Sequence, residues 1–593
     1  MRLSRLAISN FRNFQSVDIA LSNHALFVGE NQVGKSNLVH AIRLVLDASL
    51  SDSSRQLRLE DFWDGLPRPL SKDDQIEISV ELTDFKDDPN QLALLCEHLV
   101  THDPMVSRLT YIFSAAGMEG DEAPKEADYE WLVYGGGRED NPVSSEVRRR
   151  LPLEFLAALR DAESDLANWR RSPLRPLLDR AATLIDRKTL TSIAESVTEV
   201  TKSVTEIDEI SELSDRIRKR LEEIGGPSQT LDISLGFSPA DADRLLRTLR
   251  IFIDDGKRSI GEASLGSANI LYLALKLLEI DQLVEEGSRH HTFLAIEEPE
   301  AHLHPYLQRL VYRDVLQRRL HQEGEKPDDK NVQRTILLTT HSPHIVSVSP
   351  LETLVSLRKV DGATEVASAA GVTFEDADRA DLERYLDVSR GEMLFAKGVL
   401  LVEGDAEIYL VPALARLIGK DLDQLGIVVC SVSGTHFTAY VRLLHGLSIP
   451  FAVITDRDPS NDGDRGITRV LGLLSEIVSA KLLEKYPTED AQLALAQKRG
   501  LFLNDHCLEV DLFKVGRHKS MCRTIEELSD NGAAKTRAKE WAAKPATLDA
   551  ERLVKDITAI GKGRYAQRLA CIIKKDICPP YIKDAIEYVA KLC

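Results

Sequence analysis

The sequence predicts a multidomain α/β protein with two strand-and-helix regions, a helical segment inserted in the first and a helical C-terminal region. Three observations predict this fold class. Strand-like runs occur with helix patterns on both sides of the insertion and alternate with them in the second region. Apolar residues recur in steps of three and four from Leu190 to Ile224. The 593 residues also exceed what one hydrophobic core can hold.

Composition and charge favour a cytoplasmic protein with no membrane partner. The sequence has no apolar run of the roughly 18 residues that a membrane helix needs, and arginines interrupt the first residues where a signal peptide would be apolar. Its seven cysteines are scattered and form no C-x-x-C pair, which argues against a disulfide framework or a zinc site. The net charge of −19 argues against a surface coated with phosphate-binding groups.

The N-terminal region predicts a β-hairpin followed by a buried strand and a helix. Residues 2–21 alternate apolar and polar side chains around a turn, and "HALFVGE" follows as a short apolar run. Further strands are predicted at "QIEISVELTDF", "SRLTYIFSAA", "LDISLGF", "HTFLAIEEPE" and "RTILLTTHS". The helical stripe between them must pack on its own hairpin partner or on a second subunit, and we expect a homodimer.

A glycine-rich loop between the first buried strand and its helix predicts a nucleotide site. The segment "GENQVGKS" from Gly29 to Ser36 matches G-x-x-x-x-G-K-S, in which backbone N–H groups wrap phosphate oxygens. Lys35 would contact the β- and γ-phosphates, and the Ser36 hydroxyl would bind magnesium. The predicted ATP-binding residues of this segment are Gly29, Asn31, Gly34, Lys35, Ser36 and Asn37.

Two later strands and one helix start add the remaining nucleotide-binding groups. The strand in "FLAIEEPEAHLHP" ends at Glu297, which would hold magnesium, and Glu298, which would polarise the attacking water. The strand in "ILLTTHSP" ends near His341, which would sense the γ-phosphate. Ser264 and Gly266 lie in a small-residue turn that opens a helix, which predicts a second phosphate cradle.

The order of these motifs resembles ABC-type ATPases of the SMC and RecF kind. In that family two heads enclose two ATP molecules, and the signature turn of one head contacts the nucleotide of the other. This sequence departs from the family where Glu297 replaces the usual aspartate and where "SLGS" replaces L-S-G-G-Q. The resemblance therefore implies ATP binding with Mg²⁺ more securely than rapid hydrolysis.

Acidic residues at the ends of two later strands predict a second metal site. Glu403 follows "GVLLV", and Glu407 lies one helical turn later. Asp456 and Asp458 follow "FAVIT", and residues two apart along an extended strand point to the same face. Because the carboxyl ends of parallel strands line one crevice, these acids can converge. Their mutual repulsion requires a cation, and oxygen ligands favour Mg²⁺ or Mn²⁺. Acids at strand ends are often helix caps or solvated loop residues instead, and this is the alternative for Asp405.

The pairing of E-G-D-x-E with D-x-D resembles the Toprim fold of topoisomerases, bacterial primases and some nucleases. A Toprim domain behind an ABC-type ATPase resembles the OLD (overcoming lysogenization defect) family of nucleases, which includes the nuclease subunit of Gabija-type phage defence. The resemblance implies Glu509 as a further metal ligand and Lys562 as a stabiliser of the transition state. A lysine near the scissile phosphate would neutralise developing negative charge.

The expected function is a metal-dependent DNA endonuclease regulated by its ATPase, in phage defence or DNA processing. Two divalent ions about 4 Å apart would act on the phosphodiester. The predicted metal ligands are Glu403, Glu407, Asp456, Asp458 and Glu509, and Lys562 and Glu298 are the other predicted catalytic residues. The alternatives are a nucleotide-gated DNA-binding clamp or sensor without cleavage, and a subunit that needs a helicase-like or other defence protein. A topoisomerase is disfavoured because the sequence shows neither a tyrosine placed for attack nor a strand-passage domain. A primase is disfavoured because it shows neither a zinc-binding Cys/His module nor a nucleotidyl-transfer domain.

The same patterns predict the domain boundaries. The tail from 531 to 593 carries thirteen Lys and Arg against seven Asp and Glu, which favours a basic surface or a solvated helical face.

The predicted parts are an ATPase in 1–150 and 229–375, a dimerisation insertion in 151–228, a connector in 376–394, a Toprim core in 395–523 and a helical basic region in 524–593.

Overall fold

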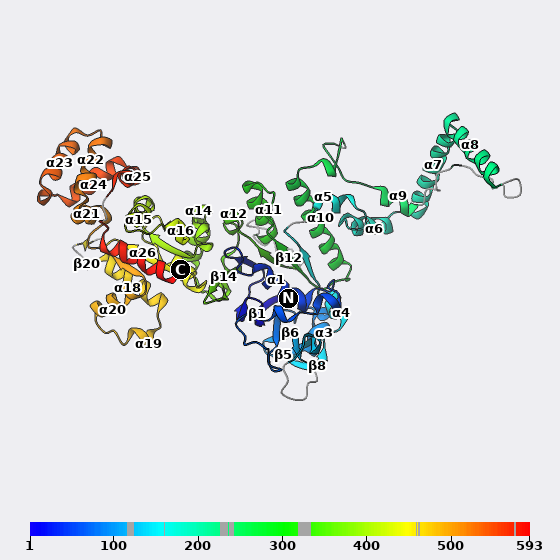
Figure 1. The fold of residues 1–593 in the computed structure, drawn as a ribbon, viewed down its shortest axis with the longest axis horizontal. Coiled ribbons are helices and arrows are strands. Elements are labelled where there is room, and N and C mark those ends of the chain that lie inside the picture. The colour runs from blue at the N-terminus through cyan, green and yellow to red at the C-terminus, as the bar shows by residue number, and fades with distance from the viewer. Residues whose placement is uncertain are drawn as a thin grey trace. The chain divides into compact units, whose positions relative to one another are not determined.

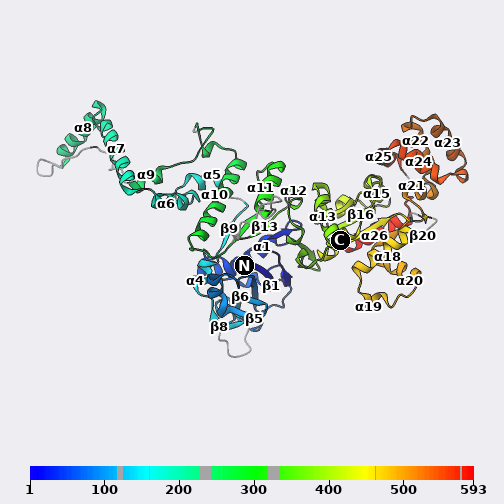
Figure 2. The same ribbon diagram turned by 180° about the vertical axis from the view of Figure 1, so that it is seen from behind.

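The structure of the protein is a computed structural model (Figures 1 and 2). The chain divides into two compact units, one formed by residues 1–158 and 290–593 and the other by residues 159–289. It describes residues 1–115, 124–158, 161–225, 235, 242–255, 257–317, 334–457, 459–460, 463–574 and 577–593. The predicted strand "LDISLGF", apart from one residue, and the predicted ligand Asp458 therefore lie outside the described residues. Within the described part, no helix combines the length and apolarity needed to cross a membrane.

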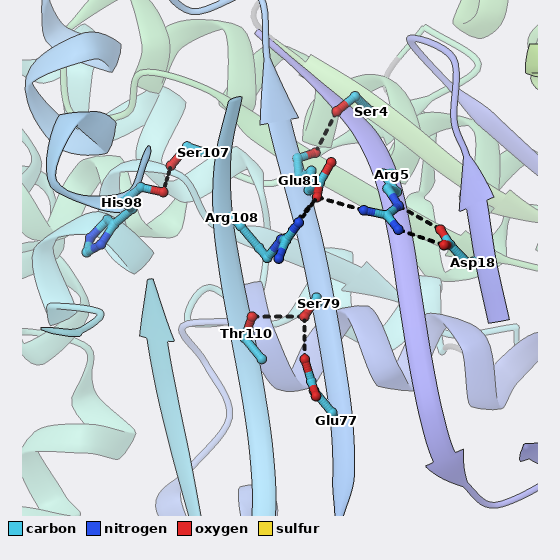
Figure 3. A network of polar contacts seen from close by, with 10 residues as sticks. All are labelled: Ser4, Arg5, Asp18, Glu77, Ser79, Glu81, His98, Ser107, Arg108 and Thr110. Carbon is cyan, nitrogen blue, oxygen red and sulfur yellow. Dashed lines mark hydrogen bonds and ion pairs between the residues drawn. The ribbon is translucent and has the colours of Figure 1, made fainter. Parts of the chain in front are cut away.

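The ATPase region begins with an antiparallel sheet whose first two strands form the predicted hairpin. Its order is β2-β1-β4-β6-β7-β8, with β5 paired to β6. Figure 3 shows a polar network on this sheet, in which the guanidinium groups of Arg5 and Arg108 both bind Glu81. The strands are β1 (Arg2–Phe11), β2 (Phe14–Ala20), β4 (Ile76–Thr83), β5 (Leu99–His102), β6 (Met105–Ala115), β7 (Tyr129–Gly135) and β8 (Arg138–Pro142).

A second sheet carries the nucleotide motifs. Its order is β15-β14-β3-β13-β12-β9, and all neighbouring pairs except β14 with β15 are parallel. The strands are β3 (Ala25–Val28), β9 (Leu153–Leu156), β12 (Thr292–Glu297), β13 (Arg334–Thr339), β14 (Leu354–Val360) and β15 (Ala363–Ser368). The described helices beside the two sheets are α1 (Lys35–Leu46), α2 (Asp52–Arg55), α3 (Pro89–Leu95), α4 (Ser145–Arg150), α11 (Pro305–Gln317) and α12 (Pro343–Val346).

Helix α1 lies between the two sheets and contacts strands of both. Apolar residues occupy most of this helix and are not confined to one stripe, so the helix is suited to a buried position. Its Leu38, Ile42 and Val45 side chains are fully buried in the core that the two sheets share. The buried helix begins at the glycine-rich loop, so the core holds the start of α1 in place. This core is the physical reason that the loop is presented at the carboxyl ends of the parallel strands.

A buried arginine, Arg55, closes the other end of α1. Its guanidinium donates to the carbonyl oxygens of Leu44 (3.3 Å), Leu50 (2.5 Å) and Asp47, which are acceptors at and after the helix end. We expect Arg55→Met to lower the free energy of unfolding by about 3 kcal/mol, because buried carbonyls lose a charged donor. Thermal unfolding of the ATPase region should shift down by roughly 6 to 12 °C. The exposed Arg58→Met is the matched control, and an equal shift there would contradict the capping role.

The second unit contains the helical insertion. Its elements are α5 (Ala162–Ala167), α6 (Leu174–Leu184), α7 (Arg187–Thr205), α8 (Asp208–Gly225), α9 (Ala242–Thr248), β10 (Phe252–Ile253), β11 (Arg258–Ser259) and α10 (Leu265–Glu285). The predicted boundaries need correction. Residues 153–156 form β9, which pairs with β12 of the ATPase sheet, and residues up to 289 cluster with the insertion. The apolar stripe is also divided between two helices, since α7 ends at Thr205 and α8 begins at Asp208.

The Toprim region contains a four-stranded parallel sheet of order β17-β16-β18-β21. The strands are β16 (Gly398–Val402), β17 (Ile427–Ser431), β18 (Phe451–Thr455) and β21 (Leu501–Leu503), and a short hairpin of β19 (Pro459–Ser460) and β20 (Gly463–Asp464) follows β18. Helices α13 (Asp376–Tyr385) and α14 (Val388–Gly391) lie within residues 376–394, for which the sequence predicts a connector. The other helices of this region are α15 (Asp405–Leu417), α16 (Leu422–Leu425), α17 (Thr438–Gly446), α18 (Arg465–Ile477), α19 (Ala480–Leu483) and α20 (Glu489–Lys498).

The C-terminal region is helical, as predicted, but it does not form a separate core. Helix α25 packs along α15, and α26 packs on strands β16, β18 and β21 (Figure 1). One hydrophobic cluster joins residues from the sheet and from these helices. The helices are α21 (Leu508–Leu512), α22 (His518–Leu528), α23 (Gly532–Ala543), α24 (Ala550–Ile560), α25 (Lys562–Ile572) and α26 (Pro580–Leu592). The predicted boundary at 523/524 falls inside α22.

Candidate functional site

Glu403 lies at the carboxyl end of β16, where its carboxylate is held by the neighbouring strand β18. Its Oε1 atom accepts hydrogen bonds from the Thr455 hydroxyl (2.6 Å) and the Asp456 backbone N–H (2.8 Å). The Arg469 guanidinium of α18 donates to the same oxygen at 2.9 Å. Because β16 and β18 pair in parallel, their carboxyl ends are adjacent. The Glu403 carboxylate and the Asp456 backbone are therefore in contact at the ends of these strands, and the convergence of the two carboxylates stays a prediction.

Glu407 lies in the first turn of α15 and is buried, with 8% of its surface exposed. The pKa of Glu407 is raised to about 7, chiefly because burial penalises the charged form, and the charges of Glu509 and Glu403 contribute to this rise. The positive charge of Lys562 acts in the opposite direction. Four ionisable groups from distant parts of the chain thus act on one another here.

Glu509 and Lys562 form an ion pair across this cluster. Glu509 is buried in α21, and its Oε1 atom lies 2.9 Å from the Lys562 Nζ atom at the start of α25. Burial alone would lower the pKa of Lys562, but the Glu509 carboxylate raises it above its ordinary value. The second oxygen of Glu509 is buried without a hydrogen-bond partner among the described residues. An orphaned carboxylate oxygen beside other acids is the observation that a bound cation would explain.

Asp456 follows β18 and is held by Asn504, which follows β21. The Asn504 amide donates to Asp456 Oδ1, and its oxygen accepts the backbone N–H of Arg457 at 2.8 Å. A buried Asp511 lies in α21, where its Oδ2 atom accepts the backbone N–H groups of Asp505 (3.1 Å) and His506 (3.2 Å). No sequence motif predicted a role for Asn504, Asp511 or Arg469.

The carboxylates of this cluster are chemically suitable ligands for divalent metal ions. They are hard oxygen donors that repel one another, and one buried oxygen lacks a partner. Within the described ranges, no set of three or more His, Cys, Asp or Glu residues is already arranged to hold a metal ion. The predicted ligand Asp458 is not among those ranges. The residues that would hold a metal are thus brought to one sheet edge without a complete coordination shell.

The nucleotide motifs are built around Lys35 at the start of α1. Its Nζ atom donates to the backbone carbonyls of Gly29 (2.9 Å) and Glu30 (2.8 Å). Burial lowers the pKa of Lys35 to about 8, although nearby Glu298 and Glu300 oppose this shift. Gly34 has a φ of 97°, and a Cβ atom there would lie 2.1 Å from the Asn13 side chain. A glycine is therefore required at this position.

The ends of β12 and β13 bring the other predicted groups close to Lys35. The two strands pair in parallel with Glu297 opposite Thr339. His341 Nε2 lies 3.7 Å from Glu298 Oε1, and burial lowers the pKa of His341. Glu300, which was not among the predicted site residues, accepts a hydrogen bond from the His341 backbone N–H at 2.6 Å. A repeated glutamate in "EEPE" was the available signal.

Two other predicted nucleotide residues, Ser264 and Asn37, have local hydrogen-bond partners. Ser264 caps the N-terminus of α10 and accepts the Ser267 backbone N–H at 3.2 Å, so the predicted helix start is present, with Gly266 in its first turn. The Asn37 side-chain amide donates a hydrogen bond to Asn13 Oδ1 (2.6 Å), in the turn of the first hairpin. Asn31 is exposed in the glycine-rich loop, and Ser36 is exposed in the first turn of α1.

Comparison with known proteins gives matches to both parts of the chain. A family model described as an AAA ATPase domain matches residues 1–133 and 156–346, which is more than half of the chain. A second model, described as the TOPRIM domain of overcoming lysogenization defect protein-like proteins, matches residues 394–458.

Named relatives align with most of the chain. The OLD nuclease of Thermus scotoductus (strain ATCC 700910 / SA-01) is 26% identical over 470 residues, which are 77% of this chain and 82% of that protein. Endonuclease GajA of Bacillus cereus (strain VD045) is 24% identical over 505 residues, 80% of this chain and 78% of that protein. The solved C-terminal region of the Burkholderia pseudomallei OLD protein is 41% identical, covers 33% of this chain and 98% of that chain, and has a TM-score of 0.31.

Proposed function

This chain belongs to the overcoming lysogenization defect (OLD) family, and we propose that it cuts DNA at the carboxylate cluster of its Toprim sheet. It is an ATPase-coupled endonuclease that uses divalent metal ions and ATP. The observation that carries the site is the meeting of Glu403, Glu407, Asp456 and Glu509 with Lys562 at one sheet edge. We assign the work of the nuclease to phage defence or DNA processing.

The protein residues of the nuclease site have separate tasks. Glu403, Glu407, Asp456 and Glu509, together with Asp458, would hold Mg²⁺ or Mn²⁺ as two ions. The ions, when bound, supply Lewis-acid activation of the phosphodiester and its attacking water. Lys562 lies close enough to Glu509 to remain charged, and its ammonium group would bind a non-bridging phosphate oxygen as negative charge develops.

A plasmid cleavage assay tests this function directly. Supercoiled DNA is incubated with the protein while Mg²⁺, Mn²⁺, Ca²⁺, chelator, ATP and ADP are varied independently. We expect nicked or linear product only with Mg²⁺ or Mn²⁺. The absence of product across metals and DNA forms would favour the alternative of a DNA-binding clamp or sensor. Cutting that needs an added helicase-like protein would assign this chain the role of a subunit.

The ATPase residues have a separate prediction. Lys35 would bind the β- and γ-phosphates of ATP, while Ser36 and Glu297 hold its Mg²⁺ and Glu298 polarises water. We expect Lys35→Ala to lower ATP turnover by about 100-fold or more, because it removes the point charge at the transferred phosphate. Turnover is measured by phosphate release, with the exposed Lys86→Ala as the control. Equal turnover in Lys35→Ala would remove Lys35 from the mechanism.

The helical insertion supports a homodimer. Its α7 and α8 helices expose apolar side chains in a stripe, with 72% of Val200 and 49% of Ile193 accessible in α7 and 43% of Leu213 accessible in α8. We expect a dimeric mass by light scattering at micromolar concentration and a monomeric mass for the double variant Ile193→Asp with Val200→Asp. A wild-type monomer at this concentration would contradict the assignment.

A further inference from the structure

The hydrogen-bond partners of Asn504 determine which way its side-chain amide is oriented. The side chain is buried, with 3% exposed, and lies directly after the short edge strand β21. The backbone N–H of Arg457 can only donate, so the Asn504 oxygen must face it. The Asp456 carboxylate accepts, so the Asn504 NH₂ group must face Asp456 Oδ1. The amide can therefore make both bonds in only one of its two flipped states.

These contacts connect the ends of two adjacent strands. The Asn504 backbone N–H also donates to the Thr455 carbonyl at 3.2 Å, and β21 pairs in parallel with β18. The backbone after β21 and the side chain of Asn504 thus hold three successive residues, from Thr455 to Arg457. This segment carries Asp456, the first acid of the D-x-D motif, and the Tyr581 hydroxyl is buried beside it.

We propose that Asn504 is a positioning residue of the nuclease, which holds the Asp456 carboxylate in its metal-binding orientation. The inference rests on the proposed function. An aspartate has a broad preference in its terminal torsion, so the carboxylate plane needs a fixed partner. Repulsion from neighbouring acids would otherwise rotate it away from the cluster. A donor to one carboxylate oxygen fixes that plane, as outer-shell hydrogen bonds do for metal ligands generally.

Arg469 bonds Glu403 in a comparable way, but Asn504 gives the clearer test. The Arg469 guanidinium brings a positive charge near the acids, so its removal changes both orientation and charge. The Asn504 amide is neutral, and its removal leaves the charge of the site unchanged. A loss of metal affinity in an Asn504 variant therefore cannot come from a changed charge.

The test is Mn²⁺ binding by calorimetry without nucleotide, in a double-mutant cycle of Asn504→Ala and Asp456→Ala. We expect Asn504→Ala to weaken Mn²⁺ binding about 10- to 100-fold. In the Asp456→Ala background the same change should have no further effect, because its target is absent. Unchanged affinity in Asn504→Ala, or equal weakening in both backgrounds, would overturn the proposal.

The control variant is Asn531→Ala, which removes an asparagine side chain that accepts two backbone N–H groups away from the carboxylate cluster. Asn531 caps α23 through Ala533 (2.9 Å) and Ala534 (3.4 Å), in the helical C-terminal region. Its loss should lower thermal stability and leave Mn²⁺ affinity unchanged. Reduced affinity there would show that general destabilisation, and not positioning, weakens the metal site.

Cleavage kinetics give a second readout, for which Asn504→Asp provides a variant that keeps the acceptor for Arg457. We expect its kcat for plasmid cleavage to fall at least about tenfold, with an unchanged KM for DNA, because an acceptor now faces Asp456. Wild-type kcat in Asn504→Asp would overturn the proposal. If the wild-type protein itself fails to cut DNA with Mn²⁺, it is the proposed function that fails.

Discussion

Asp456→Ala should lower plasmid cleavage by about 100-fold or more while ATP turnover stays at the wild-type rate. The carboxylate stands at the end of β18, beside Glu403, which accepts the Asp456 backbone N–H at 2.8 Å. Its removal takes away a negative oxygen donor from a cluster that needs several to hold a divalent ion. A loss of roughly 3 kcal/mol of transition-state stabilisation corresponds to about 100-fold in rate.

The measurement compares initial rates of nicking across a range of Mg²⁺ and Mn²⁺ concentrations. The matched control is Asp423→Ala, since Asp423 has an 87% exposed side chain in α16, before the start of β17. Because α16 precedes β17, the control removes an acid at the opposite edge of the same sheet. Cleavage by Asp456→Ala at the wild-type rate would remove this carboxylate from the nuclease site, even if the protein still cuts DNA elsewhere.

The strand-end acids could be predicted because a local rule places them. A short apolar run followed by an acid gives a strand and its carboxyl end, and parallel strands bring such ends together. Glu403 and Asp456 follow this rule, and a hydrogen bond between them exists in the structure. The rule does not depend on which helices join the strands, so it needed no knowledge of the topology.

The groups that hold these acids could not be predicted in the same way. Asn504 also follows a strand, but β21 has three residues and gives too short a pattern to indicate one. Arg469 reaches Glu403 across 66 residues of sequence from the middle of α18. An arginine on a helix has the same local pattern whether it faces solvent or a buried carboxylate. Only the packing of α18 against the sheet decides between them.

The first boundary of the insertion was wrong for a related reason. The strand β9 consists of "LEFL", whose burial alternates only weakly and whose identity comes from pairing with β12. Its partner lies about 140 residues later, on the far side of the insertion. Strand pairing across such a distance has no local signature, whereas the heptad-like spacing of α7 and α8 is entirely local. Helices were therefore easier to predict here than short parallel strands.

Lys562→Met should lower the rate of DNA cleavage by about 100- to 1,000-fold, the typical loss on removal of one donor to a developing negative charge. The Lys562 Nζ atom lies 2.9 Å from Glu509 Oε1, and 45% of the lysine side chain is exposed. The ammonium group can thus contact both the carboxylate cluster and a phosphate that approaches from solvent. Single-turnover cleavage at saturating DNA separates this loss in the chemical step from any loss of DNA binding.

Two further variants decide whether Lys562 acts on the phosphate or only balances Glu509. Lys555→Met removes a lysine with a 67% exposed side chain from the neighbouring helix α24 and should leave the rate unchanged. The double variant Lys562→Met with Glu509→Gln removes both charges of the ion pair. If Lys562 only offsets a buried carboxylate, the double variant should bind Mn²⁺ and unfold like Glu509→Gln alone, and it should cut no more slowly. A double variant slower than Glu509→Gln by the full 100-fold would instead mean that the lysine acts beyond its partner, on the charge that develops at the phosphate.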